Sequence, residues 1–151
     1  MAVWGWRKMN LSEHFTQAEL TVSETAARRG IDNTPDAFTL ANLKKLAEAL
    51  ETVRDLVGKP INITSGYRSP ALNKAIGGAA NSAHMSGLAA DINVNGYTPR
   101  QLALKIRDSG LMFDQLILEY DNWVHFGLSA GAPRRELLTI RNGTGYMKGI
   151  L

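Results

Sequence analysis

The chain has 151 residues, 44% of them hydrophobic and 21% charged, which suits one globular domain spanning residues 1–151 and excludes a disordered, collagen-like or coiled-coil protein. It has no apolar run near the ~20 residues of a membrane-spanning helix, and residues 1–10 lack the apolar stretch of a signal peptide. The chain contains no cysteine, which excludes disulfides, thiolate metal sites and a cysteine nucleophile. The formal net charge is +3, and because the whole excess lies after Pro133, nucleic-acid binding is the least favoured class.

Ser or Thr followed by Pro opens three predicted helices, and a glycine closes each of them. The side-chain oxygen caps free amide groups, Pro fits the first turn, and Gly adopts the conformation that ends a helix. The three helices are predicted over residues 34–58, 69–77 and 98–110. A weaker start at Thr16, with Glu19 three residues later, predicts one or two short helices before Gly30.

The longest predicted helix carries apolar residues at steps of three and four, the stripe of a helix that lies on a core. These residues are Leu43, Leu46, Leu50, Val53 and Val57. Five later runs predict strands, over residues 61–64, 88–94, 115–120, 123–128 and 137–141. Helices dominate the first half and strands the second, so we predict an α+β fold with helices packed on one face of a small, mostly antiparallel sheet.

One predicted strand, 88–94, carries a carboxylate, Asp91, whose side chain points away from the apolar face. The small neighbours Ala89 and Asn93 leave this carboxylate in a shallow depression that a ligand can reach. His84 precedes it in a segment too rich in small residues for a regular helix or strand. We expect this segment to fold back over the strand.

Glu119 and His125 flank the connection between two predicted strands. A two-residue turn over 121–122 would send Glu119 and His125 to opposite faces of the sheet, so that they could not share a site. A three-residue connection over 121–123 instead sets Glu119 directly opposite His125. We predict this second register, or an equivalent bulge.

Two imidazoles and one carboxylate form a complete ligand set for a catalytic zinc ion, because three protein ligands leave the fourth tetrahedral position open to water. His84, Asp91 and His125 fit this set. Glu119 could then accept a proton from the water, which would make the protein a hydrolase. Spacing alone leaves the matter open, because single His or Asp residues are more often structural or solvated and no HExxH helix is present.

Three motifs carry a resemblance to a known family. The chain contains Ser-Gly-Tyr-Arg-Ser at 65–69, Ser-Ala-His at 82–84 with Gly87 and Ala90-Asp91, and Glu119 followed by Trp-Val-His at 123–125. In order and spacing these motifs resemble the zinc D-alanyl-D-alanine peptidases, a family of carboxypeptidases and phage endolysins that shares its fold with the Hedgehog signalling domain. The resemblance covers about residues 11–128 and leaves out the basic C-terminal segment at about 132–151.

The resemblance implies that His84, Asp91 and His125 bind one Zn²⁺ ion. It implies that Glu119 is the catalytic base. It also implies that Arg68 contacts a carbonyl or carboxylate of the substrate and helps to hold developing negative charge, a role that suits a permanently ionised guanidinium.

Several other side chains receive more ordinary expectations. The resemblance also implies that Ser82, two residues before a predicted ligand, lines the cleft and supports the ligand or substrate. His14 matches no ligand position, and Asp114 and Asp121 are typical of turns. Trp123 is expected to pack beside the site. The four scattered charges of the C-terminal segment are expected mainly to aid solubility, although contact with an anionic polymer stays open.

The function implied by the resemblance is zinc-dependent hydrolysis of a peptide bond in bacterial peptidoglycan, by a D,D-carboxypeptidase or endopeptidase of the phage endolysin type. The alternatives are a zinc-containing module that binds the cell wall or a partner without cleaving it, and a virion structural protein. Glu119, retained beside all three ligands, favours the enzyme. We expect a monomer without stable membrane insertion, made in the cytoplasm without a signal peptide and active at the cell wall after release during phage lysis.

Overall fold

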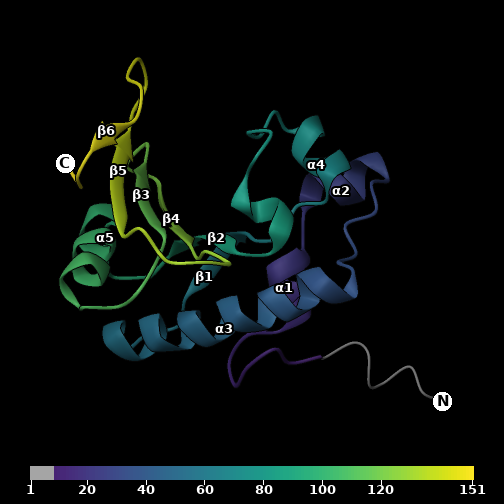
Figure 1. Cartoon of the computed structure of the whole chain (residues 1–151), viewed down its shortest axis with the longest axis horizontal. Helices are drawn as coiled ribbons and strands as arrows, with labels where there is room; N and C mark the ends of the chain where they lie inside the picture. Colours follow the sequence, from purple (N-terminus) through teal and green to yellow (C-terminus); the bar gives the residue numbers. More distant parts are fainter. Residues whose placement is uncertain (1–8) are drawn as a thin grey trace.

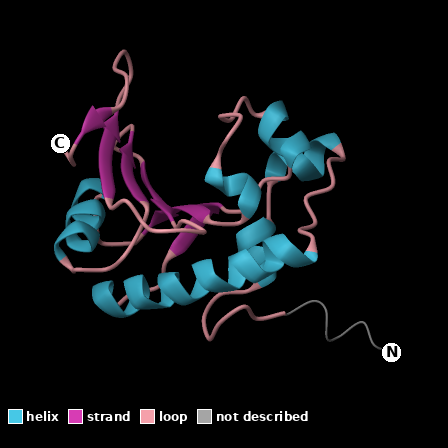
Figure 2. Cartoon of the chain, in the orientation of Figure 1, coloured by secondary structure: helices cyan, strands magenta, loops and turns pink. Residues whose placement is uncertain are grey.

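The computed structural model describes residues 9–151, so most of the segment assessed for a signal peptide lies outside the described residues. Helices dominate the first half of the chain, and its last four elements are strands (Figures 1 and 2). In chain order they are α1 (Gln17–Thr21), α2 (Glu24–Arg29), α3 (Ala37–Val57), β1 (Asn62–Ser65), α4 (Pro70–Ala75), the 3-10 helix η2 (Ala83–Ser86), β2 (Ala89–Asn93), α5 (Pro99–Asp108), β3 (Gln115–Glu119), β4 (Trp123–Gly127), β5 (Glu136–Ile140) and β6 (Met147–Lys148).

The six strands form one sheet in the order β1-β2-β4-β3-β5-β6. Neighbouring strands are antiparallel except for β3 and β5, which are parallel. The predicted α+β fold with a mostly antiparallel sheet is therefore confirmed, and each of the five predicted strands matches an observed one within about a residue at either end. Strand β6 was not predicted, because two residues are too short to show an alternating pattern.

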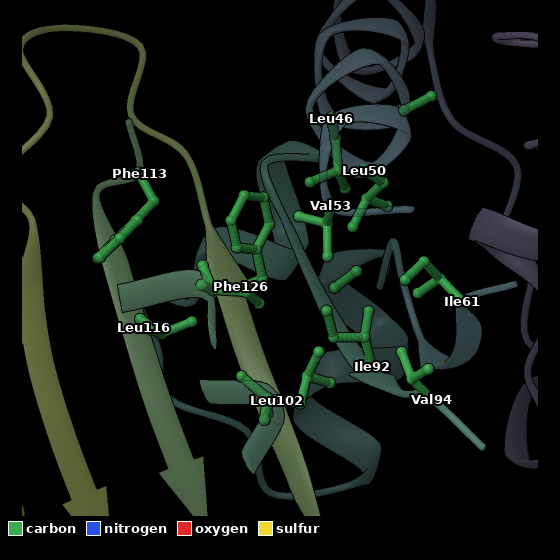
Figure 3. Packing of buried hydrophobic residues seen from close by; sticks show 14 of the residues in the cluster. Leu46, Leu50, Val53, Ile61, Ile92, Val94, Leu102, Phe113, Leu116 and Phe126 are labelled. Carbon is green, nitrogen blue, oxygen red and sulfur yellow. The ribbon is translucent and has the colours of Figure 1, made fainter. Parts of the chain in front are cut away.

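One face of the sheet carries the apolar core. The stripe on α3 packs there with Leu102 and Ile106 of α5, and the strands contribute side chains such as Ile92 and Phe126 (Figure 3). On β2 the residues with even numbers enter this core and Asp91 points to the other face, as the alternation predicts. The core-facing helices therefore leave the opposite face free for polar residues.

Helix capping follows the sequence signals at most ends. Thr16 and Thr98 each form a complete capping box, and Ser69 caps α4. The start of α3 differs from the prediction: Asp36, not Thr34, is its N-cap, and it accepts a hydrogen bond from the Thr39 N–H at 2.8 Å. Pro35 lies before the helix because an Asx-type contact, from the Thr34 N–H to Asp32 at 2.9 Å, holds this segment in a turn.

The predicted pairing of the β3–β4 hairpin is wrong by two residues. Glu119 pairs with Trp123, and the residue opposite His125 is Ile117 rather than Glu119. The connection has three residues, as predicted, but they are 120–122 instead of 121–123. Because residues two apart on a strand share a face, Glu119 and His125 still point to the same side of the sheet, as diagonal neighbours.

The turn chemistry explains this shift. Tyr120 and Asp121 have φ values of 56° and 54°, and the Asn122 N–H donates to the Glu119 carbonyl at 3.0 Å. Positive φ at both central residues is the geometry of a mirror-image tight turn, which matches the twist of the flanking strands. Asn122 is the third residue of the connection and precedes the start of β4 at Trp123. Asp121 is thus a turn residue, as expected.

The basic C-terminal segment is built into the sheet. Arg134 donates to Asp114 through Nε at 3.0 Å and Nη2 at 2.8 Å, and Arg141 pairs with Asp121 in the same two-atom manner. Arg135 donates to the Leu111 carbonyl and its guanidinium lies 4.6 Å from the centre of the Phe113 ring. Three of the four basic residues therefore tie β5 and its flanks to the rest of the molecule.

No helix within residues 9–151 combines the length and the apolar character needed to cross a membrane.

Candidate metal centre

Adjacent strands bring the first two candidate ligands together. Asp91 on β2 pairs directly with His125 on β4, so their side chains leave the sheet side by side. The Asp91 Oδ1 atom lies 3.3 Å from His125 Nδ1. Both residues are buried, at 7% exposure each. The sheet register alone therefore fixes this carboxylate–imidazole pair.

The third candidate ligand, His84, comes from the segment that folds back over this face, as predicted. Its main chain is held twice: the His84 N–H donates to the Ser82 hydroxyl at 3.2 Å, and the His84 carbonyl accepts from the Arg68 N–H at 3.1 Å. Its Nδ1 lies 2.8 Å from the Gly66 carbonyl, an acceptor only. Nδ1 therefore carries the proton, and Nε2, 3.4 Å from Asp91 Oδ1, presents its lone pair to the cleft.

These three residues fit a metal ion. One ligand atom from each lies within 4.8 Å of the other two, and no other such group of His, Asp or Glu occurs in residues 9–151. Asp91 Oδ1 is buried and has no hydrogen-bond partner in this part of the chain, which is costly unless a cation occupies the space beside it. Two imidazoles and a carboxylate are a usual set for zinc in catalytic sites.

The electrostatic environment keeps Asp91 ionised. Burial by itself would raise the pKa of the Asp91 carboxyl, but interaction with the imidazoles of His125 and His84 lowers this pKa well below its ordinary value. The carboxylate is therefore charged at neutral pH and available as a ligand.

Glu119 occupies a different environment at the edge of the same site. Its Oε1 lies 3.9 Å from His125 Nδ1, beyond hydrogen-bond distance. Burial raises the pKa of Glu119, the negative charge of Asp91 raises it further, and His125, the Trp123 indole and Arg68 oppose the rise. Trp123 packs beside Glu119, as expected, with its own ring 5.7 Å from that of Tyr120. Glu119 thus remains a free carboxyl group next to the metal position.

Arg68 reaches the site from the turn between β1 and α4. Its Nη2 lies 3.8 Å from Asp91 Oδ2, and its Nη1 donates to Asn73 Oδ1 at 3.2 Å. Burial lowers the pKa of Arg68, while the carboxylates of Asp91 and Glu119 raise it. The guanidinium is therefore a partly buried cation beside the metal position. Tyr67, its neighbour in the motif, is part of the core.

A cleft of about 710 Å³ contains Arg68, Ser82, His84, Glu119 and His125 on its walls. Of the six residues given a metal-binding, catalytic or substrate-binding role, all but Asp91 line it. The C-terminal segment supplies further lining residues that sequence reasoning missed: Arg134, Glu136, Leu138 and Tyr146. No local pattern marks these four, because they reach the cleft only through the pairing of β5 with β3 and of β6 with β5.

His14 and Asp114 lie apart from the metal position. The His14 Nδ1 atom is 2.6 Å from Glu51 Oε1, an interaction that ties the N-terminal part of the described chain to α3. Asp114 precedes β3 and accepts hydrogen bonds from Arg134. Asp114 and Arg134 both line the cleft as an ion pair, and Asp114 is not one of the three candidate ligands. The contact with Glu51 gives His14 a structural role, which is consistent with its matching no ligand position.

An α+β fold that brings together two imidazoles, two carboxyl groups and a partly buried guanidinium has the chemical groups expected of a metal-dependent hydrolase. The chain belongs to the Peptidase M15 family, whose profile matches residues 13–127. It is also similar to the zinc D-Ala-D-Ala carboxypeptidase of Streptomyces albus G, with 35% identity over 98 residues. That alignment covers 64% of this chain and 38% of the relative, so the chain spans well under half of the relative's length.

Proposed function

We propose that this protein is a zinc metallopeptidase that hydrolyses a peptide bond in bacterial peptidoglycan. The observation that carries the proposal is Glu119, a free carboxyl group with a raised pKa 3.9 Å from a candidate metal ligand, in a cleft large enough for a peptide. Membership of the Peptidase M15 family and the similarity to a zinc D-Ala-D-Ala carboxypeptidase support the choice of metal and substrate class.

His84, Asp91 and His125 would hold the zinc ion, His84 through Nε2 and His125 through Nδ1, the nitrogen that faces Asp91. A bound zinc ion supplies Lewis acidity, which lowers the pKa of water and polarises a carbonyl group. Asp91, as the anionic ligand, offsets part of the metal's charge. The Gly66 carbonyl keeps the proton of His84 on Nδ1, so that its Nε2 stays available.

Glu119 acts as the proton carrier of the reaction. Its carboxylate takes a proton from the attacking water and passes that proton to the nitrogen of the leaving amine. The guanidinium of Arg68 binds the substrate carbonyl or carboxylate and holds the negative charge that develops on the oxygen. Ser82 caps the main chain at His84 and lines the cleft, where it supports both ligand and substrate.

The test of this proposal is the substitution Glu119→Gln, which keeps the size of the side chain and removes the base. Cleavage of purified peptidoglycan, measured as release of amines, should fall by about 10²–10⁴-fold while the protein stays folded and keeps its zinc. Glu13→Gln, at an exposed surface carboxyl, should retain wild-type activity. Full activity of Glu119→Gln would remove Glu119 from this role.

A non-catalytic module that only binds the wall is the main alternative. It predicts binding of peptidoglycan without release of amines by the wild-type protein. The presence of Glu119 beside all three candidate ligands favours hydrolysis, because binding alone does not require a proton acceptor at that position.

Within this proposal we assign the protein to the phage-type endolysins, made in the cytoplasm and active at the cell wall after release during lysis. The resemblance of its motifs to a family that includes phage endolysins supports this assignment. An endolysin that cuts within the stem or cross-bridge dissolves purified walls, so their turbidity should fall. Free D-alanine in the mass spectrum of the products, with unchanged turbidity, would instead identify a carboxypeptidase.

A further inference from the structure

Asn73 on α4 is a buried polar residue that lies outside the motifs and takes no part in the mechanism above. Its side chain is among the least exposed polar groups, at 3% for the residue. Its Oδ1 accepts a hydrogen bond from Arg68 Nη1 at 3.2 Å, and its Nδ2 donates to the Ala79 carbonyl at 2.9 Å. One amide group thus binds both the cleft arginine and the loop on the other side of it.

The loop approaches this contact closely. The Gly78 N–H donates to the Asn73 carbonyl at 2.9 Å. A Cβ atom added at Gly78 would collide with Asn73 Oδ1 and lie 2.9 Å from Arg68 Nη1. Only a glycine backbone therefore fits against the hydrogen-bonded pair. The same loop continues to Ser82 and His84, so Asn73 connects the arginine to the segment that carries a candidate ligand.

The Arg68 guanidinium has two oxygen partners, the carboxylate of Asp91 and the side-chain oxygen of Asn73. Its Nη2 already faces Asp91 Oδ2 at 3.8 Å, and its buried Nε has no hydrogen-bond partner in residues 9–151. Attraction to Asp91 alone would draw the cation onto a carboxylate that is needed as a metal ligand. Asn73 offers a neutral oxygen on the other side, which restrains the cation without adding another charge.

We propose that Asn73 is a positioning residue, which holds the Arg68 guanidinium in the cleft in the orientation that receives the substrate. This inference rests on the proposed function, since the group that Arg68 receives is a carbonyl or carboxylate of the peptidoglycan peptide. Asn73 itself touches no substrate and acts through Arg68.

A double-mutant cycle tests this role. Asn73→Leu removes both side-chain hydrogen bonds at similar volume, and it should lower kcat/KM for peptidoglycan peptides by about tenfold or more, the usual loss for a hydrogen bond to a charged group. In an Arg68→Ala background, the same substitution should change kcat/KM by less than about twofold, because the group it positions is gone. Zinc content should equal that of wild type in all four proteins.

Two further variants separate positioning from general folding effects. Asn73→Asp retains an oxygen that can accept from Arg68, but it loses the donor to the Ala79 carbonyl and adds a charge, so it should recover only part of the activity lost in Asn73→Leu. Asn42→Leu is the matched control, because Asn42 is also a buried asparagine that donates to a main-chain carbonyl, that of Ser86 at the end of η2 at 2.9 Å, without contacting Arg68. Its effect on kcat/KM should be the same with and without Arg68.

The inference is overturned if Asn73→Leu lowers kcat/KM by the same factor in both backgrounds, since its role would then be general. If Asn73→Leu does not fold, Asn73→Ser enters the same cycle, with the same criterion. A wild-type protein that cleaves no peptidoglycan would contradict the proposed function. The Nη–H resonances of Arg68 in nitrogen-15 spectra then test the contact itself, because they should broaden in Asn73→Leu, which lacks the acceptor for Nη1, and stay unchanged in Asn42→Leu.

Discussion

Two carboxyl groups in the cleft are driven in opposite directions by their surroundings. The imidazoles of His125 and His84 outweigh burial and lower the pKa of Asp91, whereas burial and the nearby charge of Asp91 raise the pKa of Glu119. A carboxyl group with a lowered pKa suits a permanent metal ligand, and one with a raised pKa suits a group that takes up and gives back a proton. The opposite pKa shifts arise from where the two side chains lie in the fold, since Asp and Glu have similar ordinary pKa values.

Gly66 is a single residue on which the orientation of His84 depends. Its carbonyl faces His84 Nδ1, and a Cβ atom at residue 66 would collide with the Leu20 carbonyl at the end of α1. We expect Gly66→Ala to destabilise the fold by about 1–3 kcal/mol, the usual cost of overpacking, and to weaken zinc binding by displacing the His84 acceptor. Urea unfolding and zinc titration measure the two effects.

Gly131→Ala is the control for this substitution. Gly131 has no neighbouring atom within 4 Å of an added Cβ, so stability and zinc affinity should match wild type. If the two alanine variants have the same free energy of unfolding and the same zinc affinity, the close approach at Gly66 contributes to neither.

At the scale of elements, the parallel strand β5 completes the cleft and is clamped to β3 at its start. Asp114, just before β3, accepts hydrogen bonds from the main-chain N–H and the guanidinium of Arg134, just before β5. At the other end, the Tyr120 N–H donates to the Ile140 carbonyl at 2.8 Å. The clamps hold Leu138 beside Ile117 and so form one wall of the cleft.

The Asp114 clamp makes stability depend on pH. Hydrogen bonds from Arg134 lower the pKa of Asp114 in the folded protein. A lowered folded-state pKa means that the clamp stabilises the fold above the ordinary carboxyl pKa of about 4 and that this contribution fades as pH falls through the folded-state pKa. Asp114→Asn should therefore melt at a lower temperature than wild type near neutral pH, and the two curves should converge in acid.

Thermal melting across this pH range measures the effect, and Asp55→Asn on the exposed side of α3 is the matched control with no such pH-dependent difference. A constant gap between Asp114→Asn and wild type at every pH would show that the carboxylate charge does not stabilise the clamp.

At the scale of the whole molecule, the metal position joins parts of the chain that are far apart in sequence. Its candidate ligands come from η2, β2 and β4, so a bound ion would link the overhanging segment to the centre of the sheet. An ion that binds only the folded state stabilises the fold by mass action. Metal binding and global stability should therefore be coupled in this protein.

We expect zinc at 100 times its dissociation constant to raise the free energy of unfolding by about 2.7 kcal/mol, and a chelator to reverse the gain. Scanning calorimetry with and without zinc measures this as a shift in Tm. His84→Ala should lose most of the shift, and magnesium, which prefers oxygen ligands, should produce little of it in wild type. An identical Tm with zinc and with chelator would contradict a zinc site at this position.

Much of the candidate site could be anticipated from local sequence. Alternation on β2 placed Asp91 on the face opposite the core, and the small-residue segment before it did fold back to deliver His84. The hairpin register could not be obtained in the same way, because it depends on positive φ values at Tyr120 and Asp121, residues that adopt them only when turn and strand twist are satisfied together.

Local sequence accounts for most of the elements, most of their caps and the identity of the chemical groups, because capping, periodicity and side-chain alternation depend on residues a few positions apart. How those groups are held depends on contacts between distant parts of the chain. The contact of Asn73 with Arg68, the diagonal placement of Glu119 and His125, and the C-terminal wall with Tyr146 depend on how segments pack and on which strands pair. Those choices follow from the total packing energy of the chain, which no short stretch of sequence contains.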